Sequence, residues 1–239
     1  MTAPWRVAVL TVLLAGGWAP LRAQTAGSIM VGGPPAGRDV ALDRGFLIAK
    51  GTTLPQGRGY VAALAPTLTV GAAYGITDRL TAQVGTTLWT ISDAPSFYGT
   101  ARFGVVRSPT LNVAAGALGV VIIDNGETTA AAWPYLTTTV GTDRIAVTGL
   151  VGVGSSSSVF ETSFTGKVLL QGALEVFVSR GLEVVAEGLY LGNNTDPVGA
   201  IGVRGFLGSL ALEVGAIHAF EQGAPDTAVL PWAGVSVRF

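Results

Sequence analysis

The chain ends in the stretch Val229-Leu230-Pro231-Trp232-Ala233-Gly234-Val235-Ser236-Val237-Arg238-Phe239, which decides the fold. Every second residue counted back from Phe239 is apolar: Val237, Val235, Ala233, Pro231 and Val229. The residues between them include Arg238, Ser236 and Gly234. Because successive side chains of a β-strand point to opposite faces, this pattern predicts a strand with one apolar face and one wet face.

Residues 1–23 have the parts of a secretory signal peptide. Arg6 precedes an apolar run from Val7 to Ala15, and the small residue Ala23 precedes Gln24. A short membrane anchor is the weaker interpretation, because the run is well below the roughly 20 residues that a helix needs to cross a bilayer. We therefore expect export, cleavage near Ala23 and a flexible lead-in over residues 24–40.

Composition favours a membrane barrel. Charged residues make up 12% of the chain, against about 25% in a typical soluble protein, and the mean hydropathy is +0.53. No run of about 18 apolar residues follows Ala23, and a closed barrel is the other structure that satisfies every backbone polar group in a bilayer. The lack of cysteine excludes disulfides and thiolate metal sites, and the net charge of -1 offers no basic surface for nucleic acid.

Alternating segments of about ten residues, separated by turn signals, are typical of a transmembrane barrel. They predict an all-β fold over residues 41–239, an antiparallel up-and-down barrel of about twelve strands, with ten strands as the alternative. The expected strands are 41–52, 59–75, 79–91, 97–107, 111–123, 131–141, 144–154, 163–178, 182–191, 198–206, 209–220 and 229–239. The first of these alternates least well. An even number of strands places both termini on the periplasmic side.

Two kinds of connection alternate along the chain, as in outer-membrane barrels. Five short links are expected at 74–80, 107–110, 141–144, 179–181 and 206–209. Longer loops are expected near 53–58, 92–96, 124–130, 155–162, 192–197 and 221–228. The aromatic residues near strand ends suggest girdles at the membrane interfaces, and these are Tyr74, Trp89, Trp133, Tyr190, Phe220, Trp232 and Phe239.

Assigning the apolar residues of each strand to lipid places the other set on an inner face. The predicted lumen-lining residues are Arg102, Lys167, Gln171, Glu175, Glu183, Glu187, Arg204, Glu213 and Arg238. An Arg or Lys on the lipid face costs about 2–4 kcal/mol at the bilayer midplane, which favours this assignment. A soluble β-sandwich, with its apolar faces inward, has the same periodicity and is the alternative fold.

A lumen with both signs of charge has two interpretations. In the first, it is a polar constriction of a narrow porin-like channel for small solutes. In the second, it is a salt-bridged interior of a non-conducting structural or surface-interaction barrel. The sequence leaves both open, together with the solute and the oligomeric state.

A lipid-modifying enzyme is the third hypothesis, and it depends on His218, the only histidine. Such an enzyme needs a histidine that activates a serine, and no serine follows His218 at the second position. Residues 155–158 are serines, but this run is interpreted as a loop. The sequence therefore predicts no catalytic residue, no cofactor and no metal site.

Three short motifs, Lys50-Gly51, Gly59-Tyr60 and Tyr74-Gly75-Ile76-Thr77-Asp78, resemble the opening hairpin of a group of uncharacterised bacterial outer-membrane barrels. The match covers about residues 45–88. The C-terminal strand ending in Phe239 resembles the assembly signal of outer-membrane barrels. The resemblance implies the cell outer membrane as location, with outer-membrane lipid and the barrel-assembly machinery as partners, and it implies no substrate.

Overall fold

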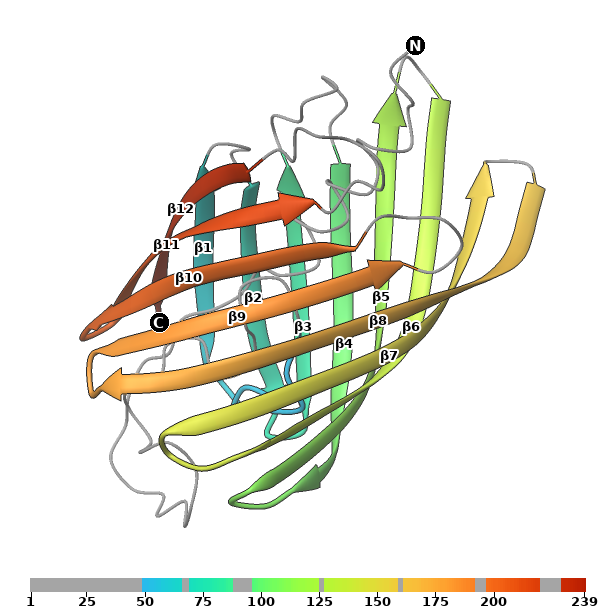
Figure 1. Cartoon of the computed structure of the whole chain (residues 1–239). Coiled ribbons are helices and arrows are strands. Elements are labelled where there is room, and N and C mark those ends of the chain that lie inside the picture. Colours follow the sequence, from blue (N-terminus) through green and yellow to red (C-terminus); the bar gives the residue numbers. More distant parts are fainter. Residues whose placement is uncertain are drawn as a thin grey trace.

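The computed structural model describes residues 49–65, 69–87, 96–124, 127–158, 161–191, 197–219 and 229–239. These residues form twelve β-strands, each antiparallel to its neighbours. The sheet closes because β1 pairs with β12, from Tyr60 opposite Arg238 to Ala65 opposite Ala233 (Figure 1). The described residues include no helix long and apolar enough to cross a membrane. The predicted twelve-stranded antiparallel barrel is confirmed.

The strands differ in length. They are β1 (Gly59–Ala65), β2 (Thr69–Thr77), β3 (Leu80–Thr87), β4 (Ser96–Arg107), β5 (Leu111–Asp124), β6 (Glu127–Gly141), β7 (Ile145–Ser158), β8 (Glu161–Ser179), β9 (Leu182–Leu191), β10 (Val198–Leu207), β11 (Leu210–Ala219) and β12 (Val229–Arg238). Strands β5 to β8 have 14 to 19 residues, whereas β1 has 7. The wall is therefore extended on the β5–β8 side (Figure 1).

The single strand predicted over 59–75 is wrong. The structure divides this stretch between β1 and β2, which form a hairpin with Gly59 opposite Tyr74. The burial pattern explains the division, because even-numbered residues are buried over 60–64 and odd-numbered residues over 69–73. One strand cannot exchange its two faces in this way. Small residues on both faces hide the exchange in the sequence.

The strand predicted over 41–52 lies mostly outside the described residues, as do the predicted signal peptide (1–23) and the lead-in (24–40). Its described part, residues 49–52, belongs to none of the twelve strands of the wall. The predicted number of strands still holds, because this loss is balanced by the division of residues 59–75. Gly59 and Tyr74 lie opposite each other in the β1–β2 hairpin, whereas Lys50 and Gly51 precede this hairpin.

The connections follow the predicted asymmetry, with two exceptions. All five predicted short links join consecutive strands at one rim, which we call the tight-turn rim. The loops predicted at 124–130 and 155–162 are wrong, because β5 to β8 continue through most of these residues. There, β6 pairs with the serine run, from Thr129 opposite Ser158 to Ala132 opposite Ser155. The backbone ladder continues because its hydrogen bonds do not require apolar side chains.

The two faces of the wall differ in chemistry. The outer face exposes large apolar side chains on every strand, including Val61, Val84, Phe103, Leu111, Leu136, Val147, Leu170, Tyr190, Ile201, Leu212 and Val237. The inner face holds the buried side chains, which are a mixture of apolar, aromatic and charged residues. Such an outer face is stable only when something apolar covers it.

Aromatic rings on the inner face lie against glycines of neighbouring strands. A Cβ on Gly85 would lie 2.2 Å from the Tyr98 ring, and a Cβ on Gly154 would lie 2.0 Å from Nε1 of Trp133. A side chain at either glycine would occupy the space of the ring. These glycines therefore allow large rings to lie flat on the wall.

This packing corrects part of the predicted aromatic girdle. Trp133 and Trp232 are 8% and 6% exposed and belong to the buried core. Tyr74, Tyr190 and Phe239 are exposed, as an interfacial position requires. Trp89 and Phe220 lie outside the described residues.

The packing of Trp133 is testable with two glycines of β7. We expect Gly154→Ala to lower the free energy of unfolding by about 1–3 kcal/mol, the usual cost of an extra methyl group in a filled core. Gly149→Ala is the matched control, since nothing lies within 4 Å of a Cβ at that exposed position. Urea titration followed by tryptophan fluorescence measures both variants, and equal midpoints would contradict the contact.

Candidate functional site

The candidate site is the inner face of the barrel. Six of the residues predicted to line the lumen are at most 7% exposed, and they are Arg102, Glu175, Glu183, Glu187, Arg204 and Glu213. Gln171 and Arg238 are half-buried, and each lies two residues from a buried side chain of its strand, Ala173 and Ser236 respectively. Lys167 belongs to β8, but its side chain lies outside the described residues.

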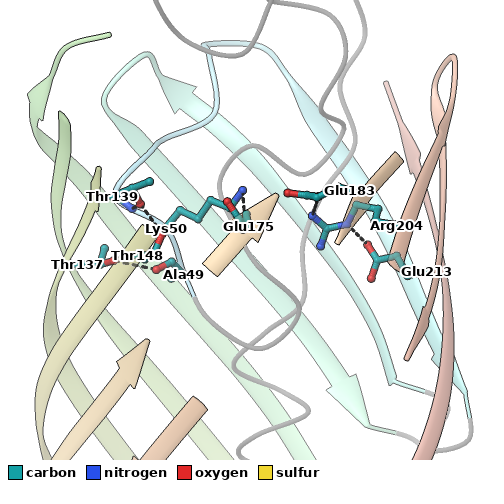
Figure 2. Close-up of polar contacts among 10 residues, drawn as sticks. Ala49, Lys50, Thr137, Thr139, Thr148, Glu175, Glu183, Arg204 and Glu213 are labelled. Carbon is teal, nitrogen blue, oxygen red and sulfur yellow. Dashed lines mark hydrogen bonds and ion pairs between the residues drawn. The ribbon is translucent and has the colours of Figure 1, made fainter. Parts of the chain in front are cut away.

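Arg204 on β10 binds two carboxylates, and we call these three residues the arginine triad. Its Nε donates to Oε1 of Glu213 at 2.9 Å, and its Nη1 donates to Oε2 of Glu183 at 2.9 Å (Figure 2). All three side chains are fully buried. The strand register causes the contact, because Arg204 lies directly opposite Glu183 on β9 and Glu213 on β11. With all three groups ionised, the triad carries one net negative charge.

A segment before β1 runs inside the barrel, and we call residues 49–58 the inner strap. Lys50, Thr53 and Leu54 of the strap are at most 4% exposed. The loop predicted over 53–58 is present, but it begins inside the barrel. Thr53 and Leu54 are buried against the wall, whereas Gln56 and Gly57 are exposed beside the β2–β3 turn.

The first end of the strap is attached to β6 and β8. Lys50 Nζ lies 2.7 Å from Glu175 Oε1, and both side chains are buried (Figure 2). Thr137 on β6 donates its hydroxyl to the carbonyl oxygen of Ala49 at 2.8 Å. The alternation of apolar and polar residues in β8 predicts that Glu175 lines the interior. No such pattern predicts Lys50, its partner in the ion pair.

The strap backbone also packs directly on the wall beside Thr139. The Gly51 N–H donates to Oγ1 of Thr139 at 2.9 Å, and this oxygen is 2.8 Å from Oγ1 of Thr148 on β7. A Cβ on Gly51 would lie 2.2 Å from the carbonyl oxygen of Asn112 on β5. Only glycine allows this close approach of two backbones.

The second end of the strap is attached to the β2–β3 hairpin. The Leu54 N–H donates to Oγ1 of Thr81 at 2.8 Å, and the Thr53 hydroxyl donates to the Asp78 carbonyl at 2.8 Å. The Gln56 N–H donates to Oδ1 of Asp78 at 3.0 Å. In the closed order, β8 is six strands from β2 in either direction. The strap backbone follows the inside of the wall from β6, over β5 and β4, to the β2–β3 hairpin, and the Lys50 side chain extends from it to β8.

Charge is concentrated at one end of the inner face. Counted along each strand from the tight-turn rim, every described charged side chain of the wall's inner face lies within the first six positions, from Arg238 to Arg102 and Glu187. Among the described side chains, the inner residues farther from this rim are uncharged. Thr69, Ser96 and Gln171 are polar, and most of the others are apolar or aromatic, including Tyr98, Leu118, Trp133, Leu169, Leu189, Val198 and Ile217. The strap lies in the charged half, beside Glu175 and the β2–β3 turn.

His218 lies apart from these groups. It pairs with Gly199 on β10 and Val229 on β12, and its neighbour Ile217 is buried, which places His218 on the outward-facing set of β11. Among the residues that the structure describes, no group of three His, Asp or Glu side chains could hold a metal ion.

No protein-family model matches this chain, and no curated protein matches it in sequence. Solved structures do match: the KdgM porin has a TM-score of 0.57 at 10% identity, over 76% of this chain and 99% of that one. The chain shares the fold of the KdgM porin. KdgM in complex with disordered oligogalacturonate gives 0.56, at 10% identity over 76% and 98% of the two chains. The NanC porin gives 0.49, at 9% identity over 76% and 98%.

Proposed function

We propose that this chain is an outer-membrane β-barrel that forms a narrow, porin-like passage for small solutes. One observation carries the proposal, namely a closed barrel whose outer face is apolar and whose inner face holds charged side chains. This is the arrangement expected of a wall between hydrocarbon and a polar interior. The fold shared with the KdgM porin supports it.

The proposed location follows from the outer face. Exposed Val, Leu, Ile and Phe side chains surround the barrel on all twelve strands, so that transfer into a bilayer removes a large apolar surface from water. We also propose, on the sequence alone, a cleaved signal peptide over 1–23 and recognition of the strand ending in Phe239 by the assembly machinery. Kinship with the barrels that carry the Lys-Gly, Gly-Tyr and Tyr-Gly-Ile-Thr-Asp motifs is part of the same proposal.

Transport is favoured over catalysis by the position of the polar groups. The charged side chains gather on the inner face, whereas the single histidine faces outward on β11. A histidine on the outer wall is separated by the sheet from the buried acids of the inner face, so these acids do not orient it toward a serine.

A second candidate function is a non-conducting structural or surface-interaction barrel. The observation that favours it is the depth of the ion pairs, since Arg204, Glu183 and Glu213 are fully buried. Buried and mutually satisfied charges are what a shut interior requires.

Single-channel recording on residues 24–239, refolded and added to a planar bilayer, tests the passage. We expect small, discrete current steps, and we expect Glu187→Gln to shift the ion preference toward anions, because it removes an inner negative charge. Arg144→Gln, at an exposed tight turn, is the control and should leave the preference unchanged. A protein that inserts, as shown by co-flotation with vesicles, and carries no current would favour the non-conducting barrel.

A further inference from the structure

We propose that the inner strap, residues 49–58, is the constriction that sets the size limit of the passage, and that the Lys50–Glu175 pair holds it in place inside the barrel. This inference rests on the proposed channel function. The strap lies on the inside of the wall from β6 to the β2–β3 hairpin, and the Lys50 side chain extends from it to Glu175 on β8. Both lie in the charged half of the interior. A solute that crosses the barrel must pass beside it.

The two ends of the strap are held differently. At the β2–β3 end, the strap is held by backbone hydrogen bonds to β2. The Gly57 N–H donates to the Gly75 carbonyl at 2.9 Å, and the Gly75 N–H donates to the Arg58 carbonyl at 2.8 Å. The chain then continues directly into β1. At the other end, three wall side chains contact the strap, those of Thr137, Thr139 and Glu175. Each of these contacts can be removed by a single substitution.

The Lys50–Glu175 contact dominates at this end. Both side chains are at most 5% exposed, and the two charged atoms are 2.7 Å apart. Removal of the Glu175 charge leaves the ammonium group of Lys50 buried without this carboxylate, which is costly. The lysine lowers that cost by moving toward water, and the first residues of the strap move with it. The passage then becomes wider.

The neutral contact from Thr137 offers a milder test. Thr137→Val removes the hydroxyl that donates to Ala49 and introduces no buried charge. Thr138→Val is the matched control on the same strand, since Thr138 belongs to the opposite, outward-facing set. Both variants replace a threonine hydroxyl by a methyl group, one on the inner face of the wall and the other on the outer face.

Two readouts separate the strap from the channel. The chain has no cysteine, so the thiol introduced by Ala49→Cys reports the exposure of the strap through its rate of labelling by a water-soluble maleimide. Current steps, together with the longest polyethylene glycol that reduces them, report the width of the passage. In the Glu175→Gln background we expect labelling to accelerate about tenfold, equivalent to about 1.4 kcal/mol of lost attachment.

The expected result is faster labelling, larger steps and a larger size limit with Glu175→Gln, a smaller change in the same direction with Thr137→Val, and none with Thr138→Val. Unchanged labelling and steps in Glu175→Gln would overturn the strap proposal, and so would an equal effect of Thr138→Val. Faster labelling in a barrel that never conducts would uphold the attachment by Lys50 and overturn the channel. Refolding of each variant is checked by heat-modifiable migration in gels.

Discussion

Arg204→Met should lower the free energy of unfolding of the barrel by about 3–5 kcal/mol, or prevent its refolding, because it leaves two buried carboxylates without their common partner. Glu183 and Glu213 both bond to the guanidinium at 2.9 Å, and neither is exposed to solvent. Without Arg204, the two negative charges lie in a low-dielectric interior, so they must find water or take up protons. Urea titration of the barrel in lipid vesicles measures the loss.

The control and the rescue make this test specific. Arg144→Met removes an arginine from an exposed tight turn and should change the midpoint little. Combining Arg204→Met with Glu183→Leu and Glu213→Leu removes all three charges together, and we expect it to recover most of the stability. A buried ion network replaced completely by apolar residues is often neutral or stabilising. A triple variant as unstable as Arg204→Met would show that lost packing, and not unpaired charge, causes the effect.

Alternation predicts the wall well wherever the outer side must be apolar. In β8 to β12 a shift by one residue would move charged side chains such as Glu183, Arg204 and Glu213 outward, so the sequence specifies the inner set strongly. The prediction fails over 59–75, where alanine and glycine occupy both sets, so that alternation does not reveal the exchange of faces. Pro66, which interrupts a strand, was the available signal. It also fails over 155–158, where serines continue β7 because the backbone ladder tolerates any side chain.

The inner set of the wall was accessible to sequence analysis, but its partners inside the barrel were not. Glu175 is identified by its position in β8, whereas Lys50 belongs to a strap that has no strand periodicity. The contact between them depends on the chain returning through the interior before β1, a feature of tertiary structure. The available signals were indirect: residues 40–52 alternate poorly, and Pro55 and Gly57 follow closely. These signals suggest a loop, and they do not distinguish a loop outside the wall from one within it.

Gly51→Ala should displace the strap and widen the passage even though no charge changes. Its Cβ would lie 2.2 Å from the carbonyl oxygen of Asn112, 2.8 Å from the carbonyl carbon of Asn112 and 3.0 Å from the backbone nitrogen of Thr139. These are backbone atoms of the paired strands β5 and β6, which cannot move without breaking the ladder. The strap must therefore move away and lose the 2.9 Å bond from Gly51 N to Thr139.

The cost of seating an alanine there is about 1–3 kcal/mol, as for other overpacked positions, and it falls on the strap more than on the wall. We therefore expect larger current steps and faster labelling of the thiol from Ala49→Cys, with a small change in the urea midpoint of the barrel. Gly188→Ala is the control, because nothing lies within 4 Å of a Cβ at that outward position on β9. If Gly51→Ala conducts and labels like Gly188→Ala, the strap does not rest on β5 and β6. An effect that matches Glu175→Gln would instead show that two unrelated contacts, one steric and one ionic, hold the same constriction.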